Sequence, residues 1–384
     1  MRHGCSPPAQ PESRPLDLVS SIQASLPTDA MTRILAAVRG EPTDLTGLAP
    51  ALVAHRVIRL VDLSGQTDPA LGEASRRAAL RCLQQAADVV RVIAAFQQAG
   101  LWVRALKGPA LSQTLYGTPD RRASTDIDIL VARTDLAAAL QVMRGLGYDQ
   151  PPFDAADVPR LLATGKDVGL KGQQGQTPVD LHWGLAPVER SLPVDLLASE
   201  PAAMVRLAGT PIPVLSPTAS LLYLIHHGSR HLWFRLLWLT DIAALQKSTA
   251  VDWPFFLHTA KFLGMMPAIS VTFALTERLL GTQNPPELAA HVRNIPSKDF
   301  DLSVFALSDP LPKDDHHLVQ RVGAFNSLLW KLRSQNRPAI QMAMLSYFLQ
   351  PTERDRSVIA LPGALSALYP LVRLSRLAWQ SWRR

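Results

Sequence analysis

The sequence predicts an α+β protein, in which a small mixed β-sheet with helices packed on it is flanked by N-terminal helices and a helical C-terminal domain. Three observations predict this class. Apolar residues recur at helical spacing over residues 28–97. Strand-like and helix-like segments then alternate over residues 101–185 and end in a hairpin pattern. From Pro217 onward, the helical spacing returns.

Length and composition fit a folded chain of two or three domains. The chain has 384 residues, of which 47% are hydrophobic and 18% charged, with a formal net charge of +7. This positive charge suits anionic partners such as nucleotides, nucleic acid or acidic surfaces, without selecting one of them. Cys5 and Cys82 have neither the number nor the spacing of a disulfide framework or a zinc site, which favours a reducing cytoplasm.

The segments at the two ends of the chain differ in character. Residues 1–27 are Pro-rich, without the apolar stretch of a secretory signal, and are predicted to be disordered. The longest uncharged run, residues 357–372, is shorter than the roughly 18 to 20 residues that span a bilayer, and two prolines interrupt it. We therefore predict no transmembrane helix. The predicted segments are a tail (1–27), a helical region (28–97), an α/β core (98–215) and a helical C-terminal domain (216–384).

The elements of the α/β core follow one another in a regular order. A helix over residues 74–100 ends at Gly100, which is suited to a helix C-terminus. Residues 101–108 predict a strand and a turn, and Pro109 suits the first turn of the short helix that follows. The remaining elements are a strand at DIDILVA, a helix over 135–146, and strands over 167–172 and 177–185 joined by the turn QQGQ.

Two aspartates stand one residue apart in the apolar run STDIDILV. On a strand, Asp126 and Asp128 project from the same face, while Ile127, Ile129 and Val131 point to the opposite face. Two neighbouring carboxylates disfavour joint ionisation unless a cation lies between them. Mg²⁺ (or Mn²⁺) meets that need, since it prefers oxygen ligands and often binds through carboxylates together with substrate phosphates.

A third acid repeats this arrangement further along the chain. Asp180 lies between apolar neighbours on a predicted strand, and His182 shares its face. If this strand pairs beside DIDILV, three carboxylates converge. Two of them can then bind metal while the third accepts a proton from an attacking hydroxyl, as in two-metal phosphoryl and nucleotidyl transfer. For His182, a structural role is the stronger alternative.

Two basic positions near the acids suit a phosphate. Lys107 and Gly108 stand at a strand-to-helix turn, where a glycine allows close backbone approach and a helix N-terminus attracts an anion. Arg122 precedes the acidic strand and can clamp a phosphate or steady the acids. The plainer alternatives are a surface lysine, a solvated loop arginine, and aspartates that act only as structural caps.

The segments LKGPALSQTLYGTPDRRASTDIDILV, GLGYD and VDLHWGL together resemble a bacterial family of nucleotidyltransferase-like proteins within the polymerase-beta-type superfamily. The resemblance covers roughly residues 98–245. It implies a small mixed sheet, bound Mg²⁺ and a nucleoside triphosphate, with ATP as the expected one. The implied reaction moves a nucleoside monophosphate to a hydroxyl of a small molecule, peptide or protein. Asp126, Asp128 and Asp180 would then be the metal-binding carboxylates, and Gly108 the glycine of the phosphate turn.

The phosphate turn departs from the family pattern. It reads Lys-Gly-Pro where the superfamily usually has Gly-Ser or Gly-Gly, so the serine hydroxyl is missing. A non-catalytic binding or antitoxin-like module that kept the fold is therefore the alternative function. Nucleic acid is a third candidate partner, but no aromatic-basic motif of an RNA-binding module supports it. The sequence also lacks a P-loop, a dinucleotide fingerprint and a nucleophile elbow.

One helix is predicted over HHGSRHLWFRLLWLTDI. Its spacing would align His227, His231, Arg235, Trp238 and Asp241 on one face. Facing the cleft, Arg235 would meet a phosphate and Trp238 would stack on a base. The alternative is a packing stripe between domains that contains an Arg–Asp pair.

Overall fold

The computed structural model describes residues 28–153, 155–198, 202–293, 295–351, 353–359, 361–362, 365 and 368–382. The predicted disordered tail, residues 1–27, lies outside the described residues. Cys82 is a buried free thiol.

The described part of the chain contains a mixed sheet, as the sequence predicted, with six strands where the sequence predicted four. Its strands follow the order β3-β4-β2-β1-β6-β5. β2 runs parallel to β4 and β1 parallel to β6, while the other neighbours are antiparallel. The strands are β1 (Val103–Ala105), β2 (Ile127–Val131), β3 (Asp167–Leu170), β4 (Val179–His182), β5 (Ala203–Leu207) and β6 (Thr210–Val214).

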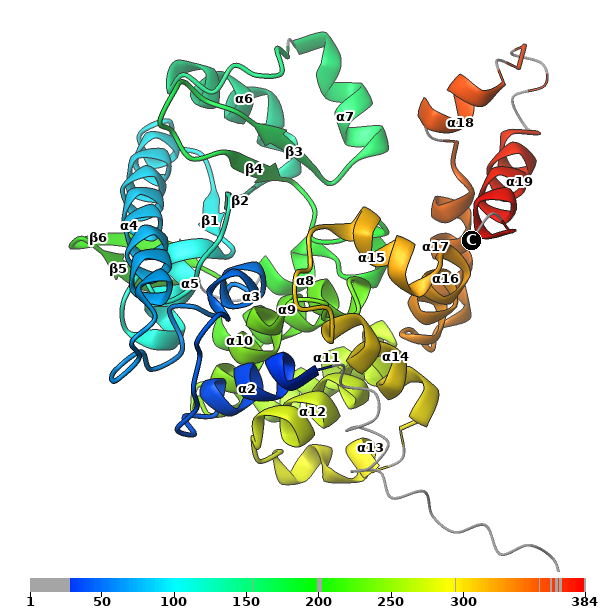
Figure 1. Cartoon of the computed structure of the whole chain (residues 1–384). Coiled ribbons are helices and arrows are strands. Elements are labelled where there is room, and N and C mark those ends of the chain that lie inside the picture. The colour runs from blue at the N-terminus through cyan, green and yellow to red at the C-terminus, as the bar shows by residue number, and fades with distance from the viewer. Residues whose placement is uncertain are drawn as a thin grey trace, which may run out of the picture.

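Helices cover the apolar face of this sheet. Ile127, Ile129 and Val131 point into one buried cluster with Val92 and Phe96, so the predicted alternation along β2 is confirmed. The long helix α4 supplies Val92 and Phe96 and stands beside the strands in Figure 1. The helices nearest the sheet are α4 (Pro69–Gln98), α5 (Gly108–Tyr116) and α6 (Leu136–Gly145).

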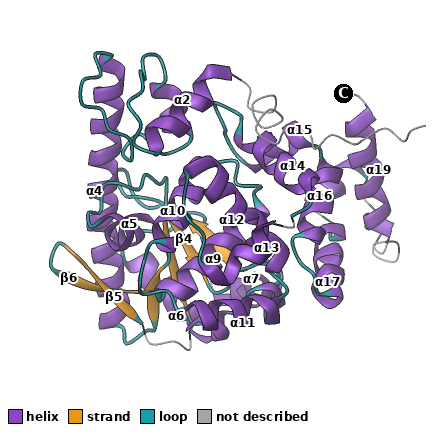
Figure 2. Ribbon diagram, turned by 90° about the horizontal axis from the view of Figure 1, so that it is seen from below, coloured by secondary structure: helices purple, strands orange, loops and turns teal. Residues whose placement is uncertain are grey.

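A second, larger core joins the two helical regions. Met31 and Ile34 near the N-terminus share a buried cluster with Leu222 and Phe273. In Figure 2 α4 lies on one side of the molecule and α16, α17 and α19 lie on the other, with β4 in between. The remaining α-helices are α2 (Thr28–Val38), α3 (Ala49–Ala54), α7 (Val158–Thr164), α8 (Val194–Ala198), α9 (Pro217–Arg230), α10 (Leu236–Gln246), α11 (Trp253–Leu263), α12 (Met266–Leu280), α13 (Ala289–Arg293), α14 (Ser297–Leu307), α15 (Asp315–Val322), α16 (Ala324–Arg333), α17 (Pro338–Leu349), α18 (Glu353–Val358) and α19 (Tyr369–Trp382).

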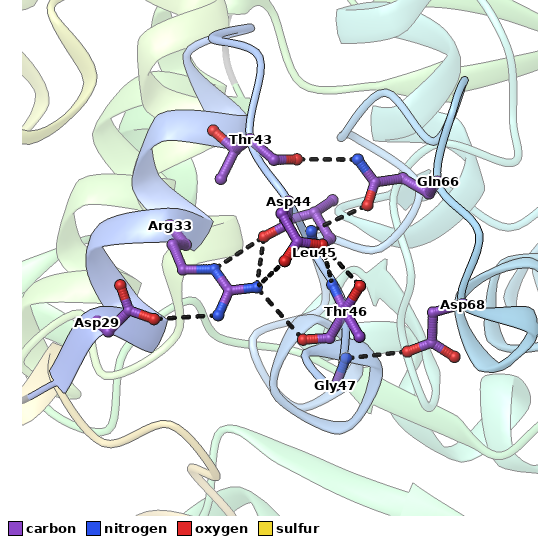
Figure 3. Close-up of polar contacts among 9 residues, drawn as sticks. All are labelled: Asp29, Arg33, Thr43, Asp44, Leu45, Thr46, Gly47, Gln66 and Asp68. Carbon is purple, nitrogen blue, oxygen red and sulfur yellow. Dashed lines mark hydrogen bonds and ion pairs between the residues drawn. The ribbon is translucent and has the colours of Figure 1, made fainter.

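A polar network fixes α2 to the segment that precedes α4 (Figure 3). Arg33 donates to the backbone and side chain of Asp44 and pairs with Asp29 at 3.0 Å. Gln66 Oε1 accepts from a backbone N–H of the same segment at 2.9 Å. Asp68, the N-cap of α4, also accepts from the N–H of Gly47. These bonds fix the loop that carries α3. Arg56, which follows α3 in this loop, lies near the acids described below.

The single helix predicted around Arg235 is wrong, because the chain forms two helices there. α9 ends at Arg230 and α10 begins at Leu236. Between them, Leu232 and Trp233 adopt left-handed φ angles of 51° and 47°. The indole of Trp233 folds back onto Gly228, where a Cβ would lie only 2.8 Å from the ring. No proline marks this break, so helical spacing alone concealed it.

The hairpin of β5 and β6 was absent from the sequence prediction. Two prolines, Pro211 and Pro213, lie in β6 and disfavour a strand because they donate no ladder hydrogen bond. β6 tolerates them because β1 pairs with it only at Ala105 opposite Val214. The prolines therefore lie where the ladder to β1 has already ended.

The C-terminal helix α19 presents its basic side to the protein. Arg373 and Arg376 bind the fully buried Asp355 at 3.0 and 2.7 Å. Leu371 and Leu374 remain 61% and 45% exposed. Within the described residues, every helix is too short or too polar to cross a bilayer.

Candidate functional site

Two of the three predicted acids meet directly across neighbouring strands. β2 and β4 run in parallel with Asp128 in register with Asp180, and with His182 opposite Leu130. One potential ligand atom from each of Asp128, Asp180 and His182 lies within 4.8 Å of the others. The expectation that the strand of Asp180 pairs beside DIDILV is confirmed. Period-two alternation then places all three side chains on the face opposite the Ile127 core.

Asp126 lies outside this compact group of three. It stands in a bend just before β2 and is half-buried, with a hydrogen bond of 3.1 Å from Thr125 Oγ1. Its charge nevertheless contributes to the raised pKa of Asp180, so it borders the same site. Asp126 thus adds negative charge at the rim, while Asp128 and Asp180 form the centre.

Asp128 is held as a buried carboxylate by two partners. Only 5% of it is exposed. Lys107 Nζ lies 2.9 Å from its Oδ1, and His182 Nε2 lies 3.1 Å from the same oxygen. Burial opposes ionisation, but the charge of Lys107 and the hydrogen bond from His182 outweigh it and hold the pKa of Asp128 well below its usual range.

Lys107 is therefore an internal cation, which excludes the surface-lysine interpretation. Its ammonium also lies 5.5 Å from the centre of the Tyr223 ring. Burial works against its charge, but Asp128 and Tyr223 more than compensate and raise the pKa of Lys107.

His182 lies between Asp128 and a further acid, and within the described residues its Nδ1 has no hydrogen-bond partner. Burial lowers the pKa of His182, so the ring is neutral near pH 7 and Nε2–H donates to Asp128. Its Nδ1 lies 3.5 Å from Oδ2 of Asp167, which stands opposite His182 at the start of β3. Asp167 belongs to the site's border, and the sequence reading gave it no role.

Asp180 has surroundings unlike those of Asp128. Burial and the charges of Asp128 and Asp126 raise its pKa. Its partner in register is Gly169, where a Cβ would come within 3.2 Å of Asp180 Oδ1. Glycine at position 169 therefore leaves space for the Asp180 carboxylate on this face of the sheet. The pairing of the two residues can be recognised only from the strand register.

The turn that was predicted to bind phosphate joins β1 to α5. Lys107 precedes α5 as its N-cap, and Gly108 begins the helix with a left-handed φ of 64°. A residue with a Cβ is strained in this conformation. The N-terminus of α5 therefore opens beside the acids, with Ser124 Oγ 3.7 Å from where a Cβ of residue 108 would lie.

The expectation that Arg122 clamps a phosphate is wrong, because this side chain is an internal structural group. It is 2% exposed, and its Nε binds Asp241 Oδ2 at 2.8 Å. Tyr116 donates to the other oxygen of Asp241 at 3.0 Å. A guanidinium committed in this way is not available to a ligand. The pair joins the β2 approach to α10, which is the packing alternative raised for Asp241.

Arg235 lies near the acids together with an arginine that the sequence reading missed. Arg235 Nη1 donates to the carbonyl of Ala54 at 3.2 Å, and its Nη2 donates to the carbonyl of Lys313. Arg56 has a left-handed φ of 61°, and its Nη2 donates to Thr125 Oγ1 at 3.2 Å. Burial and the charge of Arg235 lower the pKa of Arg56 to about 10, while Asp126 opposes that shift. Such backbone strain in a bulky residue often marks a functional position. No local sequence motif around Arg56 predicts its position near the acids.

Trp238 does not offer a free ring for stacking. Its ring meets His227 at a centroid distance of 5.2 Å and His231 at 5.4 Å, and it is 7% exposed. His231 is in turn bound to Asp315 at 2.5 Å. This cluster packs α9, α10 and α15 together, so the base-stacking expectation for Trp238 is also wrong.

The donor set at the acids fits a hard divalent cation. Carboxylate oxygens from Asp128 and Asp180 suit Mg²⁺ or Mn²⁺. Lys107 and His182 both engage Oδ1 of Asp128, which leaves Oδ2 to act with Asp180. Burial and then the charges of Asp128 and Asp126 raise the pKa of Asp180, and a cation would neutralise those charges. A divalent cation is therefore compatible with the residues present.

The site thus combines paired carboxylates from neighbouring strands of a mixed sheet with a left-handed glycine that begins a helix. The family described as "Uncharacterised nucleotidyltransferase" matches residues 47–281, more than half of the chain. The protein belongs to this nucleotidyltransferase family. The match includes all the acids of the site as well as Arg56 and Arg235.

Two other comparisons add little. A search among curated proteins gave no match. Among solved structures, the chain is similar to an antigenic nucleotidyltransferase-like protein from Paracoccidioides brasiliensis. That likeness has 14% identity and a TM-score of 0.34, and it covers 57% of this chain and 97% of the other.

Proposed function

We propose that this protein is a metal-dependent nucleotidyltransferase of the polymerase-beta type. It would move a nucleoside monophosphate from a nucleoside triphosphate, with ATP as the first candidate, to a hydroxyl of an acceptor. The observation that carries this proposal is the register of Asp128 with Asp180 beside the turn at Gly108. Family membership over residues 47–281 supports it independently.

In this proposal Asp128 and Asp180 hold Mg²⁺ or Mn²⁺, with Asp126 at the rim. When bound, the cation neutralises phosphate charge as it develops. The acceptor oxygen bonds to the α-phosphorus, the bond from that phosphorus to the bridging oxygen breaks, and pyrophosphate leaves. The hydroxyl proton would pass to Asp180, because the oxygen of Asp128 that Lys107 and His182 engage is already occupied.

The remaining residues bind and orient. Lys107 and His182 fix the carboxylate of Asp128 through its Oδ1. The N-terminus of α5 and the guanidinium of Arg56 would receive the triphosphate, with Arg235 as a second positive charge. The catalytic core would be residues 98–215, and the two arginines come from outside it. This use of Arg56 replaces the role first assigned to Arg122.

One observation favours the alternative, a non-catalytic binding module. The ammonium of Lys107 already neutralises Asp128, and the turn reads Lys-Gly-Pro without the usual serine. A protein that had lost catalysis could keep the fold by such an internal cation. Calorimetry with Mg²⁺ and the four nucleoside triphosphates separates the two functions, since the binding module would take up none of them while holding a protein partner.

The transfer reaction has a direct test. Purified protein is incubated with Mg²⁺, ATP labelled at the α-phosphate and a lysate fractionated for acceptors. We expect labelled acceptor from the wild type, and a fall of at least a hundredfold in Asp128→Asn and Asp180→Asn because each removes a metal-binding oxygen charge. Asp149→Asn, at an exposed aspartate of the same core, is the matched control. Equal labelling by all four proteins would refute the assignment of these acids.

A further inference from the structure

We propose that a polar cavity beside Asp167 and His182 binds a negatively charged group of the acceptor. This inference rests on the proposed nucleotidyl transfer and adds the chemical class of the acceptor, namely a hydroxyl compound that also carries an anion. The cavity has a volume of about 560 Å³. Its lining includes Arg133, Lys166, Asp167, Trp183, Arg230 and Tyr347.

The cavity lies next to the acidic site. Asp167, in its lining, lies opposite His182 in the β3–β4 ladder and 3.5 Å from His182 Nδ1. Lys166 is the next residue and accepts the backbone N–H of Trp183 on its carbonyl at 2.8 Å. The charges of Asp128 and Asp180 both act on Lys166. The cavity therefore adjoins the acidic site through Asp167 and Lys166.

Sheet order assigns the cavity to the acceptor rather than to the triphosphate. The strands run β3-β4-β2-β1 across the site. The turn at Gly108 follows β1, on one side of the acids, and Lys166 precedes β3, on the other side. The two anion-attracting positions thus flank Asp128 and Asp180, and the attacking hydroxyl must come from the side opposite the leaving pyrophosphate.

The lining carries an excess of positive charge. Arg133, Lys166 and Arg230 face two acids, of which Asp167 pairs with Lys166 and Glu189 lies 3.7 Å from Arg133. Arg230 is half-buried. Within the described residues, no acid or carbonyl lies within ion-pair or hydrogen-bond distance of its guanidinium group. Its place in the last turn of α9 suits the helix dipole, but the dipole does not explain why Lys166 shares the cavity.

Burial disfavours the charged forms of Lys166 and Arg230, and the charge of Arg230 adds to this effect at Lys166. Burial and the charge of Arg230 lower the pKa of Lys166 to about 8. Burial also lowers the pKa of Arg230 itself. A bound phosphate or carboxylate would relieve both costs by replacing the lost hydration with charge-assisted hydrogen bonds.

The test separates the cavity from the nucleotide site by titrating inorganic phosphate while the nucleotide site is filled. Wild-type protein is first saturated with Mg²⁺ and α,β-methylene ATP, and phosphate binding is then measured by calorimetry. We expect Lys166→Met and Arg230→Gln each to weaken phosphate binding at least fivefold and to change affinity for the ATP analogue less than twofold. Arg160→Gln, at an exposed arginine of α7, is the matched control and should behave as wild type.

Each other outcome has a definite meaning. Unchanged phosphate binding in both variants would overturn the proposal, and so would a loss of ATP-analogue affinity, which would place the triphosphate in this cavity. If wild-type protein binds no ATP analogue, phosphate is titrated alone. A loss confined to the two cavity variants then supports the anion site and contradicts only nucleotidyl transfer. If Arg230→Gln fails to fold, Arg230→Lys, which keeps the charge and should keep binding, replaces it.

Discussion

Lys107 and His182 share one oxygen of Asp128, so the most buried acid of the site carries its own counterion. Lys107 Nζ is 2.9 Å and His182 Nε2 is 3.1 Å from that oxygen. A buried ion pair contributes little net stability when intact, but removing one partner leaves a charge without compensation. The site therefore tolerates loss of Lys107 only if another cation replaces it.

This dependence gives a prediction for Lys107→Met. We expect the free energy of unfolding in EDTA to fall by about 3–5 kcal/mol, the usual cost of breaking a buried pair. Addition of Mg²⁺ should restore part of the loss in the variant, since Mg²⁺ can then neutralise Asp128. Urea denaturation with EDTA and with Mg²⁺ measures both effects, and Lys171→Met, outside the site, is the control. A loss that Mg²⁺ does not change would show that Asp128 binds no cation.

Removing the charge of Asp180 should stabilise the protein, in contrast to Lys107→Met, because the pKa of Asp180 is raised. A carboxyl with a raised folded-state pKa destabilises the protein above its unfolded pKa of about 4. This cost disappears as pH falls through the raised pKa and the group becomes neutral. Asp180→Asn should therefore unfold at a higher temperature than wild type at pH 7 in EDTA. The difference should shrink as pH falls below the raised pKa and also when Mg²⁺ is added.

Calorimetric scans between pH 4 and pH 8 check this pattern. Asp149→Asn, at an exposed acid of the same core, is the control and should unfold like wild type. If Asp180→Asn were less stable than wild type at pH 7 without metal, Asp180 would have a favourable partner, and its assignment as proton acceptor would lose its basis.

At the scale of single residues, sequence pattern located the acids but not their basic partners. Alternation along one strand placed Asp128 on the correct face, and the apolar neighbours of Asp180 did the same on β4. Arg56 lies in a loop between helices, and no local signal connects it with Asp126. Arg122 was misassigned because its position in a polar loop suggests exposure, whereas Asp241, far along the chain, buries it.

Among the secondary-structure elements, the break between α9 and α10 determines where Arg230 and Arg235 lie. Gly228 allows the ring of Trp233 to pack at the place where a Cβ would be 2.8 Å away. The left-handed turn at Leu232 and Trp233 follows from that packing. As a result Arg230 lines the cavity beside β3, while Arg235 lies near Arg56 and Asp126.

Gly228→Ala should disturb this turn. We expect a loss of about 1–3 kcal/mol in the free energy of unfolding, typical of overpacking in a filled core. Gly145→Ala, in α6, is the matched control, because its Cβ would meet nothing within 4 Å and its φ is helical. That control should be neutral or up to about 1 kcal/mol more stable. Urea denaturation of the two variants makes the comparison. Equal stability would mean that Trp233 moves without cost.

At the scale of the whole molecule, one buried ion pair ties the α/β core to the C-terminal helices. Arg122 precedes β2, and Asp241 lies in α10 with 0% exposure. Tyr116, in α5, completes the group. Burial raises the pKa of Asp241 despite the charge of Arg122, so the carboxylate depends on its partners. The sheet that carries the acids and the helix that follows Arg235 are thereby held together.

Arg122→Met should therefore lower the free energy of unfolding by about 3–5 kcal/mol, and Arg122→Met with Asp241→Leu should recover part of it. Arg76→Met, which removes an exposed pair with Glu73, should cost less than about 0.5 kcal/mol. Equilibrium urea denaturation of these variants distinguishes the two kinds of pair. A large effect on transfer activity without a change in stability would instead assign Arg122 to ligand binding.

The sequence by itself determined the fold class, the helical flanks, the apolar face of β2 and the acids that face away from it. These features depend on the period of apolar residues along the chain, which neighbouring residues set. Only the tertiary structure decided that β4 pairs with β2 in a register that joins Asp128 to Asp180. It also decided that Asp241 buries Arg122, that Arg56 borders the site, and that Arg230 and Lys166 share a cavity. Each of these is a contact between distant segments, and its geometry depends on how helices and strands pack, which no local pattern encodes.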